Sequence, residues 1–456
     1  MTSTKDSWRR ALSVYSRPEV LGMIFLGFSA GLPFILLSST LSAWLADEGV
    51  ALSVIGYFSL VGVAYSIKVF WAPVIDRFPL PLLARALGKR RAWMLLSQLG
   101  VTAGLWFMSL VPLATGLQQL ALLAVWVAFC SATQDIVIDA YRIEAVAVRF
   151  QGAMAAMYVF GYRLALLVAG AGALYLAEYQ GWQRAYQAMA IAMLVGIVST
   201  LMIVEPKHDP NRSAQEVEAD LERAFTSVAS VGLAARLLKW FLDAVAGPFV
   251  EFFRRNGRNG LLILALIALY KMSDIAMGVM ANPFYLDLGF SKKQIADVTK
   301  VFGFFMTILG TSLGGVCVVR YGLMWPLLWG AVIVAATNLL FALLAVVEPN
   351  LYLLAGVVSA DNLCGGLASA VFIAYLSSLT NSAYTATQYA LFSSLMTLPA
   401  KLVGGFSGDI VSGYGYAVFF AYASLIGVPA IVLVVLVMRF QVGNGDDLVS
   451  KDVKGE

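Results

Sequence analysis

Long apolar segments recur along this chain of 456 residues, and they constrain its fold more than any other feature. Charged residues make up only 13% of the sequence, whereas a soluble globular chain carries about 25%. A helix needs about 20 apolar residues to cross a membrane, so the chain has room for about twelve crossings. We place them at 19–46, 52–76, 92–112, 117–141, 152–178, 184–204, 260–286, 293–319, 321–347, 350–380, 385–412 and 415–440. The sequence therefore predicts an all-α integral membrane protein.

The lysines and arginines predict how the chain is oriented. Most of the 31 basic residues fall in loops on the side of the N-terminus, and few fall on the other side. Basic residues collect in cytoplasmic loops, so both termini are predicted to be cytoplasmic. The net charge of +4 is interpreted as this topological signal and not as a sign of nucleic-acid binding. The first apolar run is too long for the core of a signal peptide and is predicted to stay in place.

A charged linker divides the chain into two halves of six predicted crossings. The halves are 1–204 and 260–440, the linker is 205–259, and 441–456 forms a cytoplasmic tail. Ser213 and Glu216 fit a capping box, and an apolar stripe over 233–245 predicts either a helix on the membrane surface or a plain tether. Short stretches of the halves also resemble each other, including 149–163 and 385–399, each with a glutamine near its start, Gln151 and Gln388. A duplicated six-helix unit is typical of secondary transporters.

Ionisable residues within the apolar spans form the second constraint. The stretch FCSATQDIVIDAYRIEA at 129–145 follows a segment without charge. A charge inside the membrane is costly, so it usually faces a cavity or a partner. Further polar residues within or beside predicted spans are Lys68, Arg163, Lys271, Asp274, Asp361, Gln388 and Lys401. Structural ion pairs among Asp135, Arg163, Lys271 and Asp361 are one interpretation. Asp139, Arg142 and Glu144 are similarly predicted to pair with the basic cluster 85–91 and hold an inner gate.

Several blocks together are similar to one family. They are GFSAGLP (27–33), FSLVGVAYSIKVFWAPVIDR (58–77), GKRRAW (88–93), FCSATQDIVIDAY (129–141), GYRLALLVAG (161–170), YKMSDIAMG (270–278), PFYLDLGFS (283–291) and TATQYALFSS (385–394). From about residue 17 to 430 the chain resembles the AmpG-type muropeptide permeases of the major facilitator superfamily. It departs from them in two places: some members have two extra spans, and Ala400 stands where an arginine is frequent, with Lys401 beside it.

The resemblance implies a function. Such members carry anhydro-muropeptides, which are GlcNAc-anhydroMurNAc with or without peptides, from periplasm to cytoplasm with protons. Their import recycles peptidoglycan and feeds β-lactamase induction. The implied location is the bacterial inner membrane. The implied partners are the amphipathic sugar-peptide, protons and membrane lipid, and the protein is expected to be a monomer without nucleic acid, metal or cofactor.

For such a substrate, the position and chemistry of the polar residues predict their roles. Substrate binding is expected at Gln134, Tyr162, Lys68, Arg163, Lys271, Asp361, Asn362, Gln388 and Lys401, with Gln134 and Asp135 facing a central cavity. Proton coupling is expected at Asp135 first, then at Asp361 and Asp274. Gating is expected at Asp76, Arg77, Arg90, Arg91, Asp139 and Arg142.

Other functions stay open at this point. The chain could import another amphipathic anion, such as acetyl-CoA or a different glycopeptide, or it could be a membrane sensor that transports nothing. An enzyme is not expected, because the chain has no H-E-x-x-H motif, no G-x-S-x-G nucleophile elbow is expected, and its single histidine, His208, falls in the linker.

Overall fold

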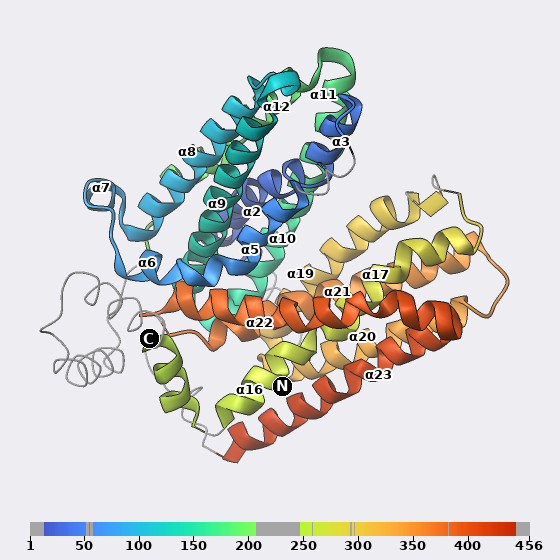
Figure 1. The fold of residues 1–456 in the computed structure, drawn as a ribbon. Coiled ribbons are helices and arrows are strands. Elements are labelled where there is room, and N and C mark those ends of the chain that lie inside the picture. The colour runs from blue at the N-terminus through green and yellow to red at the C-terminus, as the bar shows by residue number, and fades with distance from the viewer. Residues whose placement is uncertain are drawn as a thin grey trace, which may run out of the picture. The chain divides into compact units, whose positions relative to one another are not determined.

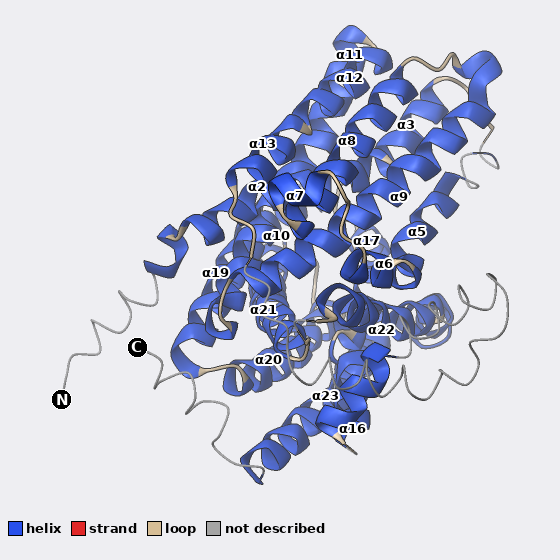
Figure 2. Cartoon of the chain, turned by 90° about the vertical axis from the view of Figure 1, so that its left-hand side faces the viewer, coloured by secondary structure: helices blue, strands red, loops and turns tan. Residues whose placement is uncertain are grey.

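The computed structural model describes residues 13–51, 54, 58–206, 247–257, 259–291, 294–295, 297–381 and 383–443. Over these ranges the chain forms helices joined by short connections, and no strand (Figures 1 and 2). It divides into two compact units. The first contains Met1–Phe249 together with Ser377–Leu391, and the second contains Val250–Leu376 and Phe392–Glu456. The capping box, the apolar stripe and His208 of the predicted linker lie outside the described residues.

The first unit contains the six crossings predicted before the linker. Its helices are η1 (Val14–Ser16), α2 (Pro18–Leu36), α3 (Ser39–Asp47), η2 (Ser59–Gly62), α5 (Val63–Ile67), η3 (Lys68–Phe70), α6 (Ala72–Arg77), α7 (Leu83–Leu87), α8 (Lys89–Ser109), α9 (Leu113–Ala145), η4 (Val148–Phe150), α10 (Gln151–Leu167), the π-helical η5 (Val168–Gly172), α11 (Ala173–Gln180), α12 (Trp182–Ala192) and α13 (Leu194–Met202). The first crossing is interrupted between α2 and α3, where Ser38 leaves the helical conformation a few residues after Pro33.

The second unit repeats this pattern. Its helices are α16 (Asn259–Tyr270), α17 (Met272–Asp287), the π-helical η7 (Asp297–Phe302), α19 (Gly303–Tyr321), α20 (Met324–Leu344), α21 (Leu351–Ser378), α22 (Thr385–Gly405) and α23 (Ser407–Gly443), and the ends of α21 and α22 at 377–391 belong to the first unit. Its first crossing is also interrupted, at Lys271 between α16 and α17. Discontinuous helices near mid-membrane are a feature of transporter sites.

Nine helices among the described residues are long and apolar enough to cross a membrane. The other three predicted crossings are 52–76, 92–112 and 385–412. In the structure these contain the short helices over 59–77, helix α8 and helix α22. The crossing 52–76 is divided among helices too short to cross a membrane singly. Two of the three crossings carry the polar side chains Lys68 and Gln388, whose contacts are described below. Polar residues within membrane helices tend to be functional.

Glycines bring helix backbones into contact in both units. In the first unit, a Cβ on Gly27 or Gly161 would overlap backbone atoms of Tyr158 or Ile24, so α2 and α10 touch directly. In the second unit, Gly310 and Gly314 of α19 meet the backbone of α21 in the same way. Membrane helices associate through such small residues because lipid supplies no hydrophobic force between helices. Gly27, Gly161, Gly310 and Gly314 are therefore helix-contact residues.

Substituting alanine for Gly161 is expected to lower the melting temperature of detergent-purified protein. The added methyl group would overlap the Ile24 carbonyl, and overpacking of this kind costs about 1–3 kcal/mol. Fluorescence-detected size exclusion after stepwise heating measures the folded fraction. The control is Gly278→Ala in α17, where a Cβ meets no atom within 4 Å. Equal melting temperatures for both variants would contradict the backbone contact.

Both units also contain the same buried polar contact between three helices. In the first unit, Gln98 of α8 donates to Ser29 of α2 at 3.4 Å, and Gly196 of α13 packs on that serine. In the second unit, Asn338 of α20 donates to Ser273 of α17 at 2.6 Å, and Gly427 of α23 lies beside it. An amide of the third crossing, a serine of the first and a glycine of the sixth therefore meet twice. This repetition supports the internal duplication indicated by the sequence.

Candidate functional site

Asp135 lies at the centre of a polar cluster in the first unit. Its Oδ1 is buried and has no hydrogen-bond partner among the described residues. Lys68 of η3 interacts with it electrostatically, and so does Asp139, one helical turn further along α9. The side chains of Tyr65, Tyr158 and Tyr162 also interact electrostatically with Asp135. Sequence analysis predicted an important carboxylate here, and the structure surrounds it with one cation and three tyrosines.

Gln134 does not share the environment of Asp135. It is fully buried, and its Nε2 donates to Ser29 Oγ at 2.9 Å, on the same serine that Gln98 contacts. Successive residues on a helix point about 100° apart, so the two neighbours turn to different sides of α9. The expectation that both face one cavity therefore needs correction: Gln134 packs between α9 and α2.

Ser29 is held within the helix bundle. The residues 27–31 read G-F-S-A-G, the letters of the hydrolase nucleophile motif, which requires a sharp turn from a strand to a helix. Here Ser29 is fully buried inside α2 and accepts hydrogen bonds from Gln98 and Gln134. Its surroundings are those of a helix-packing residue.

The remaining predicted cation of the first unit is Arg163. It lies on α10 beside Tyr162, is exposed, and forms no ion pair or hydrogen bond within the described residues. Lys68, which is half-buried, likewise has no ion-pair partner at contact distance in that part of the chain. Two cations without carboxylate partners at contact distance leave positive charge available for an anionic ligand.

The second unit holds its own charged cluster at the break in its first crossing. Lys271 Nζ contacts Asp274 Oδ2 at 2.5 Å and Ser369 Oγ at 2.7 Å. Asp361 of α21 interacts electrostatically with Asp274 and Lys271. The structure therefore brings Lys271, Asp274 and Asp361 together, as their predicted depth indicated.

Three other residues predicted to bind substrate, Asn362, Gln388 and Lys401, do not belong to these two charged clusters. Both amide atoms of Asn362 are engaged, by Thr307 Oγ1 at 3.0 Å and by the carbonyl of Val358 at 2.9 Å. Gln388 is fully buried and bonds the backbone of Asn381 and Pro248. These amides hold helices together in the described conformation. Lys401 lies in α22, and its side chain is outside the described part.

Asp76, at the end of α6, holds the N-terminus of α22. Its two oxygens accept four hydrogen bonds, from Arg90 Nη2 at 2.9 Å, from the backbone amides of Ala386 at 3.1 Å and Thr387 at 2.7 Å, and from Thr387 Oγ1 at 2.7 Å. A carboxylate has about four lone-pair sites, so Asp76 is saturated. The N-terminus of a helix also carries a partial positive charge, which favours an anion. This contact ties residues 385–387 to the first unit.

Arg90 connects Asp76 to the end of α9. Its guanidinium is buried and binds Glu144 through Nε at 3.0 Å and Nη2 at 2.6 Å. Burial lowers the pKa of Arg90, but the carboxylates of Glu144 and Asp76 outweigh it and raise the pKa above its ordinary value. Burial and the neighbouring Arg90 lower the pKa of Lys89, whose Nζ donates to the backbone carbonyl of Asp76 at 2.6 Å. The predicted pairing of Glu144 with the basic cluster is present.

Glu205 is a residue that sequence analysis did not single out. Its carboxylate accepts from the backbone amides of Arg90 at 2.7 Å and Arg91 at 3.0 Å, at the start of α8. The side chain of Arg91 in turn donates to the carbonyls of Thr200 and Leu201 at the end of α13. The available signal was an acidic residue directly after the predicted crossing 184–204, because the first turn of a helix attracts carboxylates.

Arg142 forms a second buried contact near the end of α9. It pairs with Asp139 at 3.4 Å, donates to Ser377 Oγ at 2.9 Å and lies 5.0 Å from the ring centre of Tyr389. Gln151 accepts from it at 3.4 Å and also donates to the last carbonyls of α9. Asp139 and Arg142 were predicted to pair with the basic cluster, but they pair with each other because they lie one turn apart on one face.

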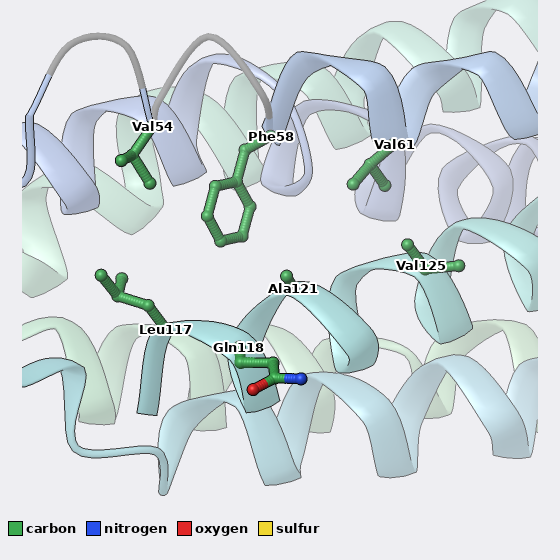
Figure 3. Close-up of a pocket in the computed structure, with 7 residues that line it drawn as sticks. All are labelled: Val54, Phe58, Val61, Leu117, Gln118, Ala121 and Val125. Atoms are coloured by element: carbon green, nitrogen blue, oxygen red, sulfur yellow. The ribbon is translucent and has the colours of Figure 1, made fainter. Parts of the chain in front are cut away.

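A separate pocket of about 400 Å³ lies between three side chains, Val54, Phe58 and Val61, and helix α9. Figure 3 shows its lining, which is Val54, Phe58, Val61, Leu117, Gln118, Ala121 and Val125. It contains no predicted site residue and one polar side chain. A charged ligand would find no counter-charge there, so the polar clusters are better candidates for a transport site.

The Major Facilitator Superfamily model matches residues 20–400, which is most of the chain. The chain belongs to the major facilitator superfamily. A solved structure titled as the proton:xylose symporter XylE bound to 6-bromo-6-deoxy-D-glucose matches 92% of this chain and 94% of that chain. Its TM-score is 0.61 and its sequence identity is 12%, so this likeness concerns the fold.

Curated relatives place the chain among the AmpG-type members of the superfamily. The Anhydromuropeptide permease of Escherichia coli K12 is 35% identical over 427 residues, covering 93% of this chain and 81% of that protein. An AmpG-named protein of Rickettsia conorii is 31% identical over 424 residues, covering 92% of this chain and 97% of that protein. This member of the superfamily is therefore a multi-pass membrane transporter for a small molecule.

Proposed function

We propose that the protein is a monomeric, proton-coupled permease that imports anhydro-muropeptides from the periplasm across the bacterial inner membrane. Both termini are cytoplasmic in this proposal, and the imported sugar-peptides enter peptidoglycan recycling and β-lactamase induction. The observation that carries it is the 35% identity with the Anhydromuropeptide permease over 93% of this chain. A transport protein with intramembrane charges in both units fits an amphipathic, charged substrate.

The substrate's carboxylates are assigned to three cations of the predicted spans. Arg163 and Lys68 in the first unit carry this role, and Lys271 does so in the second when Asp274 is displaced or protonated. Arginine binds carboxylates through two parallel hydrogen bonds, which makes Arg163 the most selective of the three. Tyr162 lies beside Arg163 and contributes a ring and a hydroxyl group.

The contacts of Asp76, Arg90, Glu144, Asp139 and Arg142 are assigned to the cytoplasmic gate. Asp76 and Arg142 each bind residues of 377–391 through buried hydrogen bonds. Buried charged pairs are costly to break without replacement partners, so they favour one discrete closed arrangement. Release of substrate to the cytoplasm would require these contacts to separate.

The proposal is tested by uptake of radiolabelled GlcNAc-anhydroMurNAc-tripeptide into proteoliposomes with an imposed inward pH gradient. We expect accumulation above the external concentration, and its loss when a protonophore is added. Uptake that the protonophore leaves unchanged would refute proton coupling. Absence of any uptake, while acetyl-CoA or another amphipathic anion accumulates, would reassign the substrate. Absence of uptake of every such compound would favour the sensor.

Substituting lysine for Arg163 is expected to weaken uptake of a carboxylate-bearing muropeptide about tenfold, because lysine cannot form the planar two-bond contact. The methyl-esterified substrate should lose much less. Initial uptake rates over a concentration series give KM and kcat for both substrates. Arg184→Lys on the exposed start of α12 is the matched control. Equal losses on both substrates would point to a structural role for Arg163.

A further inference from the structure

Four aromatic rings from three helices form a contiguous set next to Asp135 in the first unit. Phe34 of α2 lies 5.7 Å from the ring of Tyr65 of α5, edge to face, and 6.3 Å from the ring of Tyr162 of α10. Tyr158 continues the set at 6.0 Å from Tyr162. We refer to these four residues as the aromatic face. Aromatic pairs at such separations stabilise one another, so the rings hold fixed positions.

The positions of these rings follow from the contact between α2 and α10. A Cβ on Gly31 would lie 2.7 Å from the Tyr162 carbonyl and 3.1 Å from a ring carbon of Tyr162. Gly27 and Gly161 allow the two backbones to meet one turn away. Phe34 lies directly after Pro33, a few residues before the interruption of the first crossing. The glycines therefore place Tyr162 against Phe34, and a larger side chain would separate the rings.

The exposure of these rings differs from that of packing aromatics in the same unit. Tyr186 and Tyr141 are 0% and 1% exposed, as expected for rings that fill a core. Phe34 is 43% exposed, and Tyr65, Tyr158 and Tyr162 are only partly buried. A set of mutually fixed rings that keeps part of its surface free can still accept a flat apolar ligand face.

Polar groups border the aromatic face on the side of α9. Tyr65 Oη donates to Ser131 Oγ at 2.8 Å, and Asp135 follows one turn later with a buried Oδ1 that has no partner among the described residues. Lys68, one turn after Tyr65, adds a cation. Rings beside a carboxylate and an ammonium match a ligand that has an apolar face and a rim of hydroxyl groups. A pyranose ring has that character, because its C–H bonds form one face and its hydroxyl groups point outward.

We propose that the aromatic face is the saccharide subsite of the transporter. The disaccharide lies with a C–H face on Phe34, Tyr65 and Tyr162, and hydroxyl groups at its edge donate to Asp135. The peptide part extends away from these rings. This inference rests on the proposed function for the identity of the sugar, and it assigns the sugar half of the substrate to the first unit.

The test is equilibrium binding of radiolabelled GlcNAc-anhydroMurNAc, without peptide, to detergent-purified full-length protein. Binding does not require transport, so its result is separate from that of the uptake experiment. Phe34→Leu removes an exposed ring and is expected to raise the Kd of the disaccharide about fivefold. Phe34→Tyr keeps the ring and should stay within about twofold of wild type. The peptide without sugar serves as a second ligand. The concentration of peptide that displaces half of the bound muropeptide should be the same in the wild type, Phe34→Leu and Phe34→Tyr.

The control is Phe107→Leu on α8, a ring that is 56% exposed and does not belong to the aromatic face. It should bind the disaccharide as wild type does. The inference is overturned if the wild-type protein does not bind the disaccharide, or if Phe34→Leu binds it as tightly as wild type does. It is also overturned if Phe34→Leu weakens binding of the peptide as much as binding of the disaccharide. If the disaccharide binds as expected but no muropeptide is taken up, the proposed function fails and the subsite stands.

Discussion

Replacing Arg90 by methionine is expected to destabilise the protein by about 3–5 kcal/mol, the range found when one partner of a buried ion pair is removed. Arg90 is 1% exposed and binds Asp76 and Glu144, which are buried as well. The substitution would leave two carboxylates with one fewer charged donor. We expect little folded protein at the wild-type melting temperature, measured by fluorescence-detected size exclusion after heating.

The Arg90 result can be separated from a general effect of losing charge. Arg85→Met in α7 removes an exposed arginine of the same loop and should keep the wild-type melting temperature. Adding Asp76→Asn and Glu144→Gln to Arg90→Met removes the unpaired charges and should restore part of the loss. If Arg90→Met melts at the same temperature as Arg85→Met, the ion-pair network does not stabilise the fold.

Replacing Asp135 by asparagine is expected to abolish accumulation of substrate against a gradient while counterflow exchange continues. Asparagine resembles a permanently protonated aspartic acid, so the site could still load and unload substrate but could not exchange a proton. Asp135 is ranked before Asp274 because Lys271 forms a direct ion pair with Asp274, and it keeps its predicted place before Asp361. No cation lies at ion-pair distance from Asp135 among the described residues, and its Oδ1 is unbonded there.

Both transport modes should be measured on one proteoliposome preparation. Concentrative uptake under an inward pH gradient should fall to the level of empty vesicles, and exchange of internal unlabelled for external labelled muropeptide should persist. Asp409→Asn, an exposed carboxylate of α23, is the control and should concentrate substrate normally. If Asp135→Asn still concentrates substrate, the same experiment on Asp361→Asn and Asp274→Asn decides between the remaining carboxylates.

The sequence alone determined the class of the protein and the positions of its crossings. Hydropathy is a sum over about 20 consecutive residues, so a membrane span can be found without knowing what packs beside it. Intramembrane charges such as Lys271 and Asp361 could be identified for the same reason, because their cost depends on depth. The motifs at 58–77 and 129–141 also indicated the family. The match of residues 20–400 to the superfamily model confirms the superfamily to which that family belongs.

The direction in which each polar side chain points was decided only by the tertiary structure. Helices in a membrane are apolar on several faces, so the period of 3.6 residues does not reveal which face is buried against protein. Gln134 and Asp135 therefore had the same expected environment, although one contacts Ser29 and the other lies beside tyrosines. Likewise, Asp76 binds Thr387 across 311 positions of sequence, and Glu205 binds the start of α8 across more than 100. Such contacts depend on how each helix is rotated against neighbours that are distant in sequence, which local composition does not specify.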